Sequence, residues 1–201
     1  MNEIAKKQFA LHGVVILLGL TAILGKLTSI AALPLVVYRT FIASLIIGLF
    51  FWKGIKSDFN KRSFLWLIFT GILLGSHWLC FFGSARMATA SLSLVTFSTT
   101  SFFTSIMEPI SKKERISQKE LLLGSMVFIG MVFIFSFESV HVYAILVGLF
   151  GAVLASLYSV SNVHLAKKNG AVYINFVELS AAFVFTLCTL IGWIMFNKQP
   201  I

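Results

Sequence analysis

Charged side chains inside long apolar segments are the residues of this sequence best suited to chemistry. Arg39, Glu108 and Glu178 stand in three different apolar segments, and Lys26 lies near the end of a fourth. A charge at the depth of a lipid bilayer is costly, so residues of this kind commonly mark substrate or ion pathways. An arginine there would attract an anionic group, and a buried glutamate would hold a proton or an amine.

Hydroxyl side chains repeat every four residues in the segment that ends with Glu108. Thr96, Thr100 and Thr104 precede this glutamate at that spacing, which places all four residues on one slowly drifting helix face. Lipid would not solvate such a face, so we expect it to look into the protein. The alternative is that each hydroxyl bonds back to its own helix and that the Glu108-Pro109 pair shapes the helix end.

Other polar residues inside the apolar segments complete a set of candidates for a substrate or coupling-ion pathway. The set is Arg39, His77, Thr100, Thr104, Glu108, Tyr158, Asn162 and Glu178. Three of the residues considered have simpler interpretations that stay open. His77 would serve as a packing residue, Arg39 would bond helix-end carbonyls, and the stem of Lys26 would snorkel to the membrane surface.

Short motifs for catalysis or cofactor binding are absent from the sequence. It contains no P-loop, no HExxH and no G-x-S-x-G elbow. Cys80 and Cys188 lie far apart in apolar segments, without the cysteine and histidine spacing of a zinc site. We therefore predict neither an enzyme nor a bound cofactor or metal.

The composition excludes a soluble domain. Hydrophobic residues make up 58% of the 201 residues and charged residues 11%, and Asp58 is the single aspartate. A soluble domain is about a quarter charged, whereas here lipid must cover the apolar surface. The formal charge of +9 does not indicate nucleic-acid binding, because the basic residues sit in short clusters between apolar runs.

Seven apolar runs are long enough to cross a membrane. About 20 residues of helix span the roughly 30 Å hydrocarbon core, and the backbone in lipid must be helical to satisfy its hydrogen bonds. The sequence therefore predicts an all-α polytopic transmembrane bundle. The runs are 9–30, 33–52, 63–84, 90–111, 117–137, 141–165 and 172–196.

Basic residues alternate between the two sides of this predicted bundle. The first side carries Lys6, Lys7, Lys53, Lys56, Lys61, Arg62, Lys112, Lys113, Arg115, Lys119, Lys167 and Lys168, whereas the loops on the other side carry only Arg86, with Lys198 after the last run. By the positive-inside rule the N-terminus is cytoplasmic. We expect a multi-pass protein of the plasma (cell inner) membrane.

A short internal repeat suggests inverted symmetry. Residues 17–25 (LLGLTAILG) resemble residues 146–154 (LVGLFGAVL), and the span after each copy carries a charge, Arg39 or Glu178. The two copies are five spans apart, and an odd number of spans turns the second copy upside down. Inverted repeats are typical of secondary transporters, which bind substrate near the midplane between the repeats.

Residues 75–135 contain the Glu108-Pro109 pair, the KKERIS-QKELLLG stretch after it and Gly130, and they are preceded by GLTAILGKL (19–27) and YRTFIA (38–43). In these features the chain resembles EamA-like members of the drug/metabolite transporter superfamily. Such proteins typically have ten spans in two inverted halves. The resemblance implies residues 1–137 as a first five-helix repeat and residues 138–201 as the first two helices of an incomplete second repeat.

The resemblance further implies a secondary transporter of small organic metabolites such as amino acids. It would work by alternating access without ATP hydrolysis, and export is favoured over import. We expect lipid and a small-molecule substrate as partners, with a homodimer as one way to cover exposed polar faces. The alternative is a non-transporting membrane protein or an inactive remnant of a C-terminally truncated transporter.

Arg39 and Glu178 occupy matching places in the two copies of the repeat. Inversion would separate them by roughly 10 Å along the membrane normal, so we expect no direct salt bridge between them. In this hypothesis Arg39 attracts an anionic group from one side. Glu178, with Glu108 at similar depth, holds a proton or an amine on the other.

Overall fold

Long α-helices form almost the whole computed structural model, which describes residues 3–54, 60–135, 141–167 and 169–197. Within these ranges there is no strand. The helices are α1 (Glu3–Leu27), α2 (Ala32–Phe50), the short 3-10 helix η1 (Trp52–Gly54), α3 (Lys61–Met87), α4 (Ala90–Ser98), α5 (Thr100–Lys112), α6 (Gln118–Phe135), α7 (Val142–Ala166) and α8 (Ala171–Asn197).

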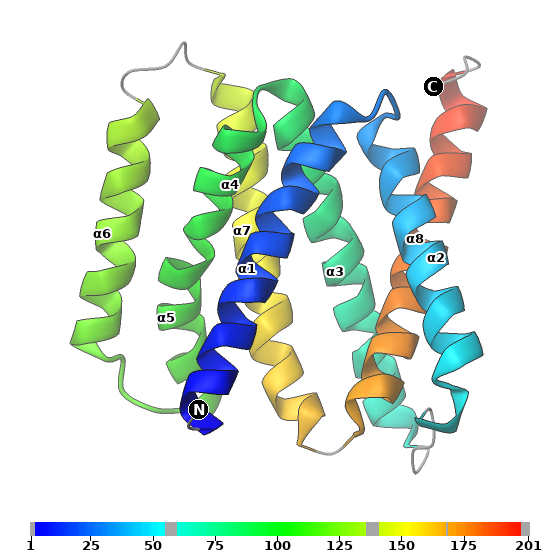
Figure 1. Ribbon diagram of the computed structural model, residues 1–201, viewed down its shortest axis with the longest axis horizontal. Coiled ribbons are helices and arrows are strands. Elements are labelled where there is room, and N and C mark those ends of the chain that lie inside the picture. Colours follow the sequence, from blue (N-terminus) through cyan, green and yellow to red (C-terminus); the bar gives the residue numbers. More distant parts are fainter. Residues whose placement is uncertain (1–2, 55–59, 136–140, 168, 198–201) are drawn as a thin grey trace.

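The described residues form a bundle of seven helical spans, which confirms the predicted all-α polytopic fold. Six of the long helices and the α4–α5 pair are long and apolar enough to cross a membrane. They run alternately up and down, so α1 begins at one end and α8 finishes at the other (Figure 1). The α1–α2 corner lies at the upper end and the α7–α8 corner at the lower end, so the two hairpins have opposite directions.

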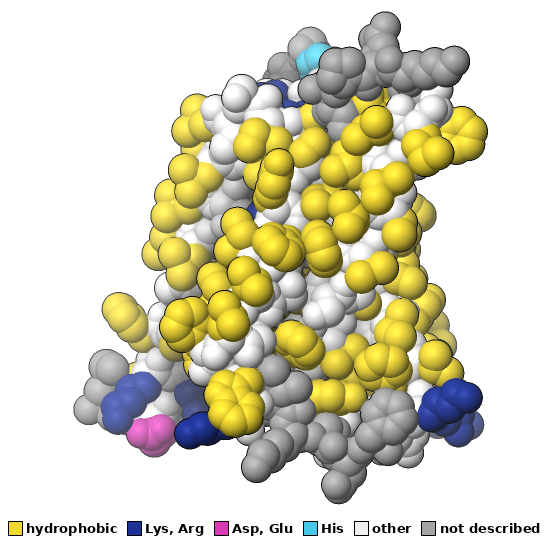
Figure 2. All heavy atoms as spheres, turned by 90° about the vertical axis from the view of Figure 1, so that its right-hand side faces the viewer, with side chains coloured by type: hydrophobic (Ala, Val, Ile, Leu, Met, Phe, Trp, Pro, Cys, Tyr) yellow, Lys and Arg dark blue, Asp and Glu magenta, His cyan; other side chains and the backbone are white. Residues whose placement is uncertain are grey.

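The surface has an apolar middle and one strongly basic end. Figure 2 shows hydrophobic side chains over the middle of the bundle, with Lys and Arg gathered at its lower edge. We call this lower edge, where α1 and α3 begin and α5 and α7 end, the basic end. Its described basic residues include Lys6, Lys7, Lys61, Arg62, Lys112, Lys113, Arg115, Lys119 and Lys167.

Helix α3 lies at the centre because it packs against both α7 and α8. Glycines make this close packing possible. A Cβ at Gly71 would lie 2.6 Å from the Glu178 carbonyl oxygen of α8. A Cβ at Gly151 of α7 would lie 2.8 Å from the Cβ of Cys80. Small residues let membrane helices approach this closely, and here they bring polar side chains of three helices within hydrogen-bond reach.

The fourth span is broken, whereas the sequence predicts one continuous helix over 90–111. Regular helix ends at Ser98 and resumes at Thr100. Four consecutive hydroxyls, those of residues 98–101, each donate to the carbonyl three residues earlier. Side chains that capture helix carbonyls in this way compete with the backbone amides for those carbonyls. This competition accounts for the break at Thr99.

Two cations tie the corners of the bundle together at the end opposite the basic end. Lys26, near the end of α1, donates to the carbonyls of Arg86 (3.2 Å) and Ala88 (2.8 Å), where α3 ends. Arg86 in turn donates to the carbonyls of Gly25 (3.0 Å) and Thr28 (2.6 Å), where α1 ends. Each helix thus supplies the cation that neutralises the negative end of the other. This reciprocal cap replaces the snorkelling interpretation of Lys26.

The reciprocal cap predicts that Lys26→Met lowers the stability of the folded protein. The substitution keeps an apolar stem but leaves two helix-end carbonyls without their donor, which costs about 1–3 kcal/mol. We expect a lower midpoint of thermal unfolding in mild detergent, followed by circular dichroism. Lys7→Met on the exposed part of the same helix is the matched control. Equal midpoints for the two variants would contradict this role for Lys26.

Candidate functional site

A buried carboxyl group is the centre of a polar cluster that three helices of the bundle share. The side chain of Glu178 on α8 has an exposed fraction of 0%. Its Oε1 accepts a hydrogen bond from the Thr70 hydroxyl of α3 at 2.6 Å. Its Oε2 accepts from the Tyr158 hydroxyl at 3.0 Å and from the Asn162 amide at 3.1 Å, both on α7. Three helices therefore supply one carboxyl group and its donors.

The sequence explains how these side chains meet. Tyr158 and Asn162 are four residues apart, so they lie on the same face of α7. Gly71 admits the backbone of α8 next to α3 at the level of Glu178, which brings the adjacent Thr70 into range. Sequence reasoning missed Thr70, although its position beside Gly71 of a GxxxG pair was a usable signal.

The Thr70 hydroxyl has a single hydrogen and three acceptors within reach. Besides Glu178 it lies 3.1 Å from the carbonyl oxygens of Trp66 and of Leu67. When Glu178 is ionised, the hydroxyl donates to the carboxylate. When Glu178 carries a proton, the carboxyl O–H donates to Thr70, whose hydrogen returns to its own helix. An oxygen–oxygen distance of 2.6 Å suits either direction, so the cluster accommodates both protonation states without moving heavy atoms.

A cavity of about 440 Å³ adjoins this cluster at the basic end. It lies between α7 and α8 and is lined by Tyr158, Asn162 and Glu178 together with Ser159, Asn169 and Asn175. The Asn162 Oδ1 atom is buried and meets no hydrogen-bond donor within the described ranges. Buried polar atoms normally have a partner, so this oxygen offers a free acceptor beside the carboxylate.

Arg39 and His77 meet at a second, smaller cavity of about 50 Å³. The Arg39 guanidinium of α2 lies 4.6 Å from the centre of the Trp78 ring and 4.8 Å from that of Phe82, both on α3. The His77 Nδ1 atom is 3.0 Å from the Gly151 carbonyl oxygen of α7. The structure therefore places Arg39 on aromatic faces and ties His77 to α7.

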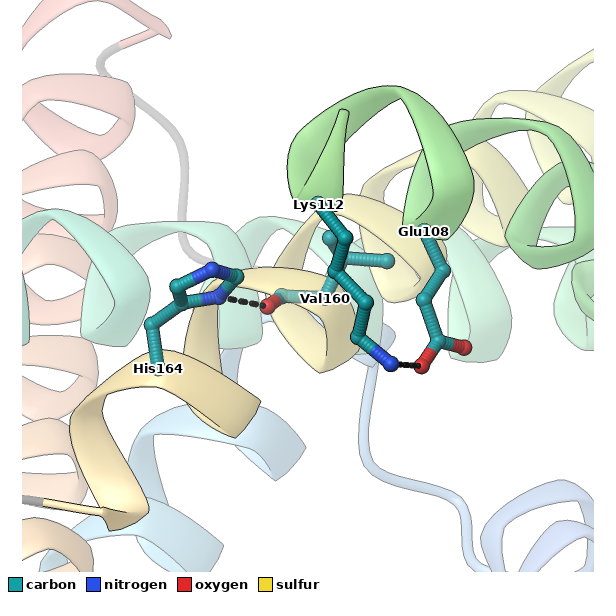
Figure 3. Close-up of polar contacts among 4 residues, drawn as sticks. All are labelled: Glu108, Lys112, Val160 and His164. Atoms are coloured by element: carbon teal, nitrogen blue, oxygen red, sulfur yellow. Dashed lines mark hydrogen bonds and ion pairs between the residues drawn. The ribbon is translucent and has the colours of Figure 1, made fainter. Parts of the chain in front are cut away.

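The remaining candidates are not part of the Glu178 cluster. Glu108 forms an ion pair with Lys112 at 2.5 Å on α5, beside the turn of α7 that carries Val160 and His164 (Figure 3). Thr100 bonds back to the Phe97 carbonyl, whereas Thr104 reaches Ser156 of α7 at 3.0 Å. The row of threonines thus fails to form one continuous polar face.

The Glu108-Pro109 pair belongs to a helix end. Lys113 takes a left-handed conformation with φ of 57° just after α5. The amide of Glu114 donates to the Pro109 carbonyl at 2.8 Å, and that of Lys113 donates to Ile110. This pattern is a Schellman motif, so the local geometry favours the helix-shaping interpretation of the pair over a substrate contact.

These features define a class of protein, a polytopic helical membrane protein with a buried ionisable site in its bundle. The family model of the EamA-like transporter family matches residues 6–136. The chain belongs to this family, whose members are membrane transporters of small molecules. No curated protein and no solved structure matches the chain.

The Thr70 contact predicts unequal effects of two small substitutions. Thr70→Val keeps the shape but removes the donor from a buried carboxyl group, which costs about 1–3 kcal/mol of unfolding free energy. Thr70→Ser keeps the hydroxyl, so its stability should stay closer to that of wild type. The thermal midpoints in detergent compare the two variants. A valine variant as stable as the serine variant would show that this hydrogen bond contributes nothing.

Proposed function

We propose that the chain exports small organic metabolites that carry an amine, such as amino acids, by alternating access without ATP hydrolysis. Glu178 is the residue at which the solute amine and a coupling proton compete. One observation carries this proposal, the fully buried Glu178 carboxyl group with three donors beside a cavity of about 440 Å³. Cavities of roughly 300–1,000 Å³ suit small organic ligands.

The polar groups that line the cavity favour binding of a solute that carries an amine. Among the described residues that line it, Glu178 is the acidic one, and none is a lysine or an arginine. The Asn162 Oδ1 atom is a further acceptor without a donor in the described structure. An ammonium group has three hydrogens and no acceptor, so it would satisfy both the carboxylate and the amide oxygen once Tyr158 moved aside.

The proton role follows from the same geometry. Because Thr70 can donate to Glu178 or accept from it at 2.6 Å, the site holds its shape whether or not Glu178 is protonated. A solute amine would need the ionised carboxylate, whereas an empty site would return to the opposite side of the membrane with Glu178 protonated. Exchange of one for the other is a physical basis for proton-coupled export.

The transport test uses the purified 201-residue chain in proteoliposomes with an imposed pH gradient. Uptake of a panel of radiolabelled amino acids is compared for wild type and Glu178→Gln. We expect wild type to accumulate at least one solute against its gradient, and Glu178→Gln to lose the dependence on the pH gradient. Glu120→Gln, a surface glutamate at the start of α6, is the control and should behave as wild type.

Two outcomes would overturn the proposed function. One is an absence of flux for every amino acid and simple amine tested, from protein that is folded by circular dichroism. The other is flux in Glu178→Gln with the rate and pH dependence of wild type, which would move the transport site elsewhere in the bundle.

We also propose that the basic end faces the cytoplasm of a cell with the chain in its inner membrane. Single cysteines in a variant without Cys80 and Cys188 test this orientation. Lys113→Cys lies at the basic end and His141→Cys at the opposite end. An impermeant maleimide applied to intact cells should label His141→Cys and should label Lys113→Cys only after lysis. The reverse pattern would invert the proposed topology.

A further inference from the structure

Arg39 has a setting that its helix packing alone does not explain. Its side chain is half-buried at a cavity lined by residues of α1, α2, α3 and α4, and its guanidinium lies over the rings of Trp78 and Phe82. Within the described ranges it has no hydrogen-bond acceptor and no acidic partner. A cation–π contact stabilises such a group from the ring faces, but it satisfies none of the five N–H donors at the guanidinium edge.

The cavity beside this guanidinium is also lined by the imidazole of His77, whose hydrogen can be assigned to one ring nitrogen. His77 is 7% exposed, and the Gly151 carbonyl can only accept, so Nδ1 must carry the hydrogen of that 3.0 Å contact. The imidazole also stacks on the ring of Phe97, with 5.1 Å between the two ring centres. Within the described residues the Nε2 atom has no hydrogen-bond partner, so it can bind another group. Thr21 of α1 adds a hydroxyl at the rim of the same cavity.

We propose that this cavity is a binding site for the carboxylate group of an organic anion or zwitterion. The guanidinium binds the two carboxylate oxygens edge-on, in the bidentate geometry that arginine favours. The faces of Trp78 and Phe82 hold the guanidinium plane in place. A volume of about 50 Å³ admits the carboxylate and little more, so the rest of the solute extends out of the cavity past the other aromatic rings that line it.

The carboxylate site is separate from the Glu178 cluster. Along α3 the nearest residues of the two sites, Thr70 and His77, are seven positions apart, which is roughly 10 Å of helix. The carboxylate and amine of one α-amino acid cannot span that distance. A zwitterionic solute would therefore contact Arg39 and Glu178 in turn, at two stages of one passage. In this respect the inference rests on the proposed transport function, although binding of a carboxylate does not require transport.

An equilibrium binding experiment tests the site directly. Trp52, Trp66 and Trp193 are replaced by Phe, so that fluorescence reports on Trp78, whose ring is 4.6 Å from the Arg39 guanidinium. Sodium acetate, sodium fluoride at equal ionic strength and neutral acetamide are titrated in a nonionic detergent without anionic lipid. We expect a saturable fluorescence change with acetate and none with the other two. Arg39→Gln should weaken acetate binding at least tenfold.

Matched variants separate a binding role from a structural one. Arg62→Gln removes an exposed arginine at the start of α3 and should leave the acetate response intact. Arg39→Lys keeps the cation and should bind acetate more weakly than wild type but better than Arg39→Gln. If Arg39→Gln does not fold, the contrast between acetate and acetamide in the otherwise unchanged chain still decides the question.

Distinct results overturn the site and the transport function. Equal responses to acetate, fluoride and acetamide, or an unchanged response in folded Arg39→Gln, would defeat the carboxylate site. Acetate binding in a chain that moves no amino acid or amine would leave the site standing and defeat the transport function. Transport of a solute without any response to acetate would defeat the carboxylate site and leave the transport function standing.

Discussion

Burial of the Glu178 carboxyl group is the constraint on which the rest of the bundle depends. A carboxyl group in a membrane interior is tolerated only where hydrogen-bond donors replace water. The protein supplies those donors from α3 and α7, so both helices must lie close to α8. The glycine at position 71 allows that approach. Close helix packing and hydrogen bonding of the buried carboxyl group therefore require the same arrangement of α3, α7 and α8.

The two ends of the bundle are organised differently around this site. At the end opposite the basic end, Lys26 and Arg86 cap each other's helices and hold two corners together. At the basic end, the cavity beside Glu178 reaches the turn between α7 and α8, through Ala166 and Ala171. One end is thus held closed by hydrogen bonds between helix ends, whereas the other contains a cavity. The alternating-access cycle that we propose would require this kind of asymmetry in any single state.

The spans follow from the sequence because a bilayer imposes length and apolarity on every crossing helix. Tyr158, Asn162 and Glu178 were predictable as polar residues at depth, and the structure brings them together. Thr70 was harder to foresee, since one threonine in an apolar run more often bonds its own helix.

Backbone acceptors leave no trace in a sequence, so the reciprocal caps of Lys26 and Arg86 could not be predicted. The break at Thr99 depends on four neighbouring hydroxyls, whose competition with the backbone depends on tertiary context.

Proton coupling by this bundle would require an exchangeable proton at Glu178 within an unchanged fold. Infrared difference spectroscopy of the purified chain, titrated with acid and base in H₂O and in D₂O, measures this directly. We expect a carboxyl C=O band that rises and falls reversibly with pH, shifts in D₂O and disappears in Glu178→Gln but not in Glu120→Gln. The helical amide bands should stay constant throughout. A spectrum in which no carboxyl band depends on Glu178 over the pH range of the folded state would contradict the account.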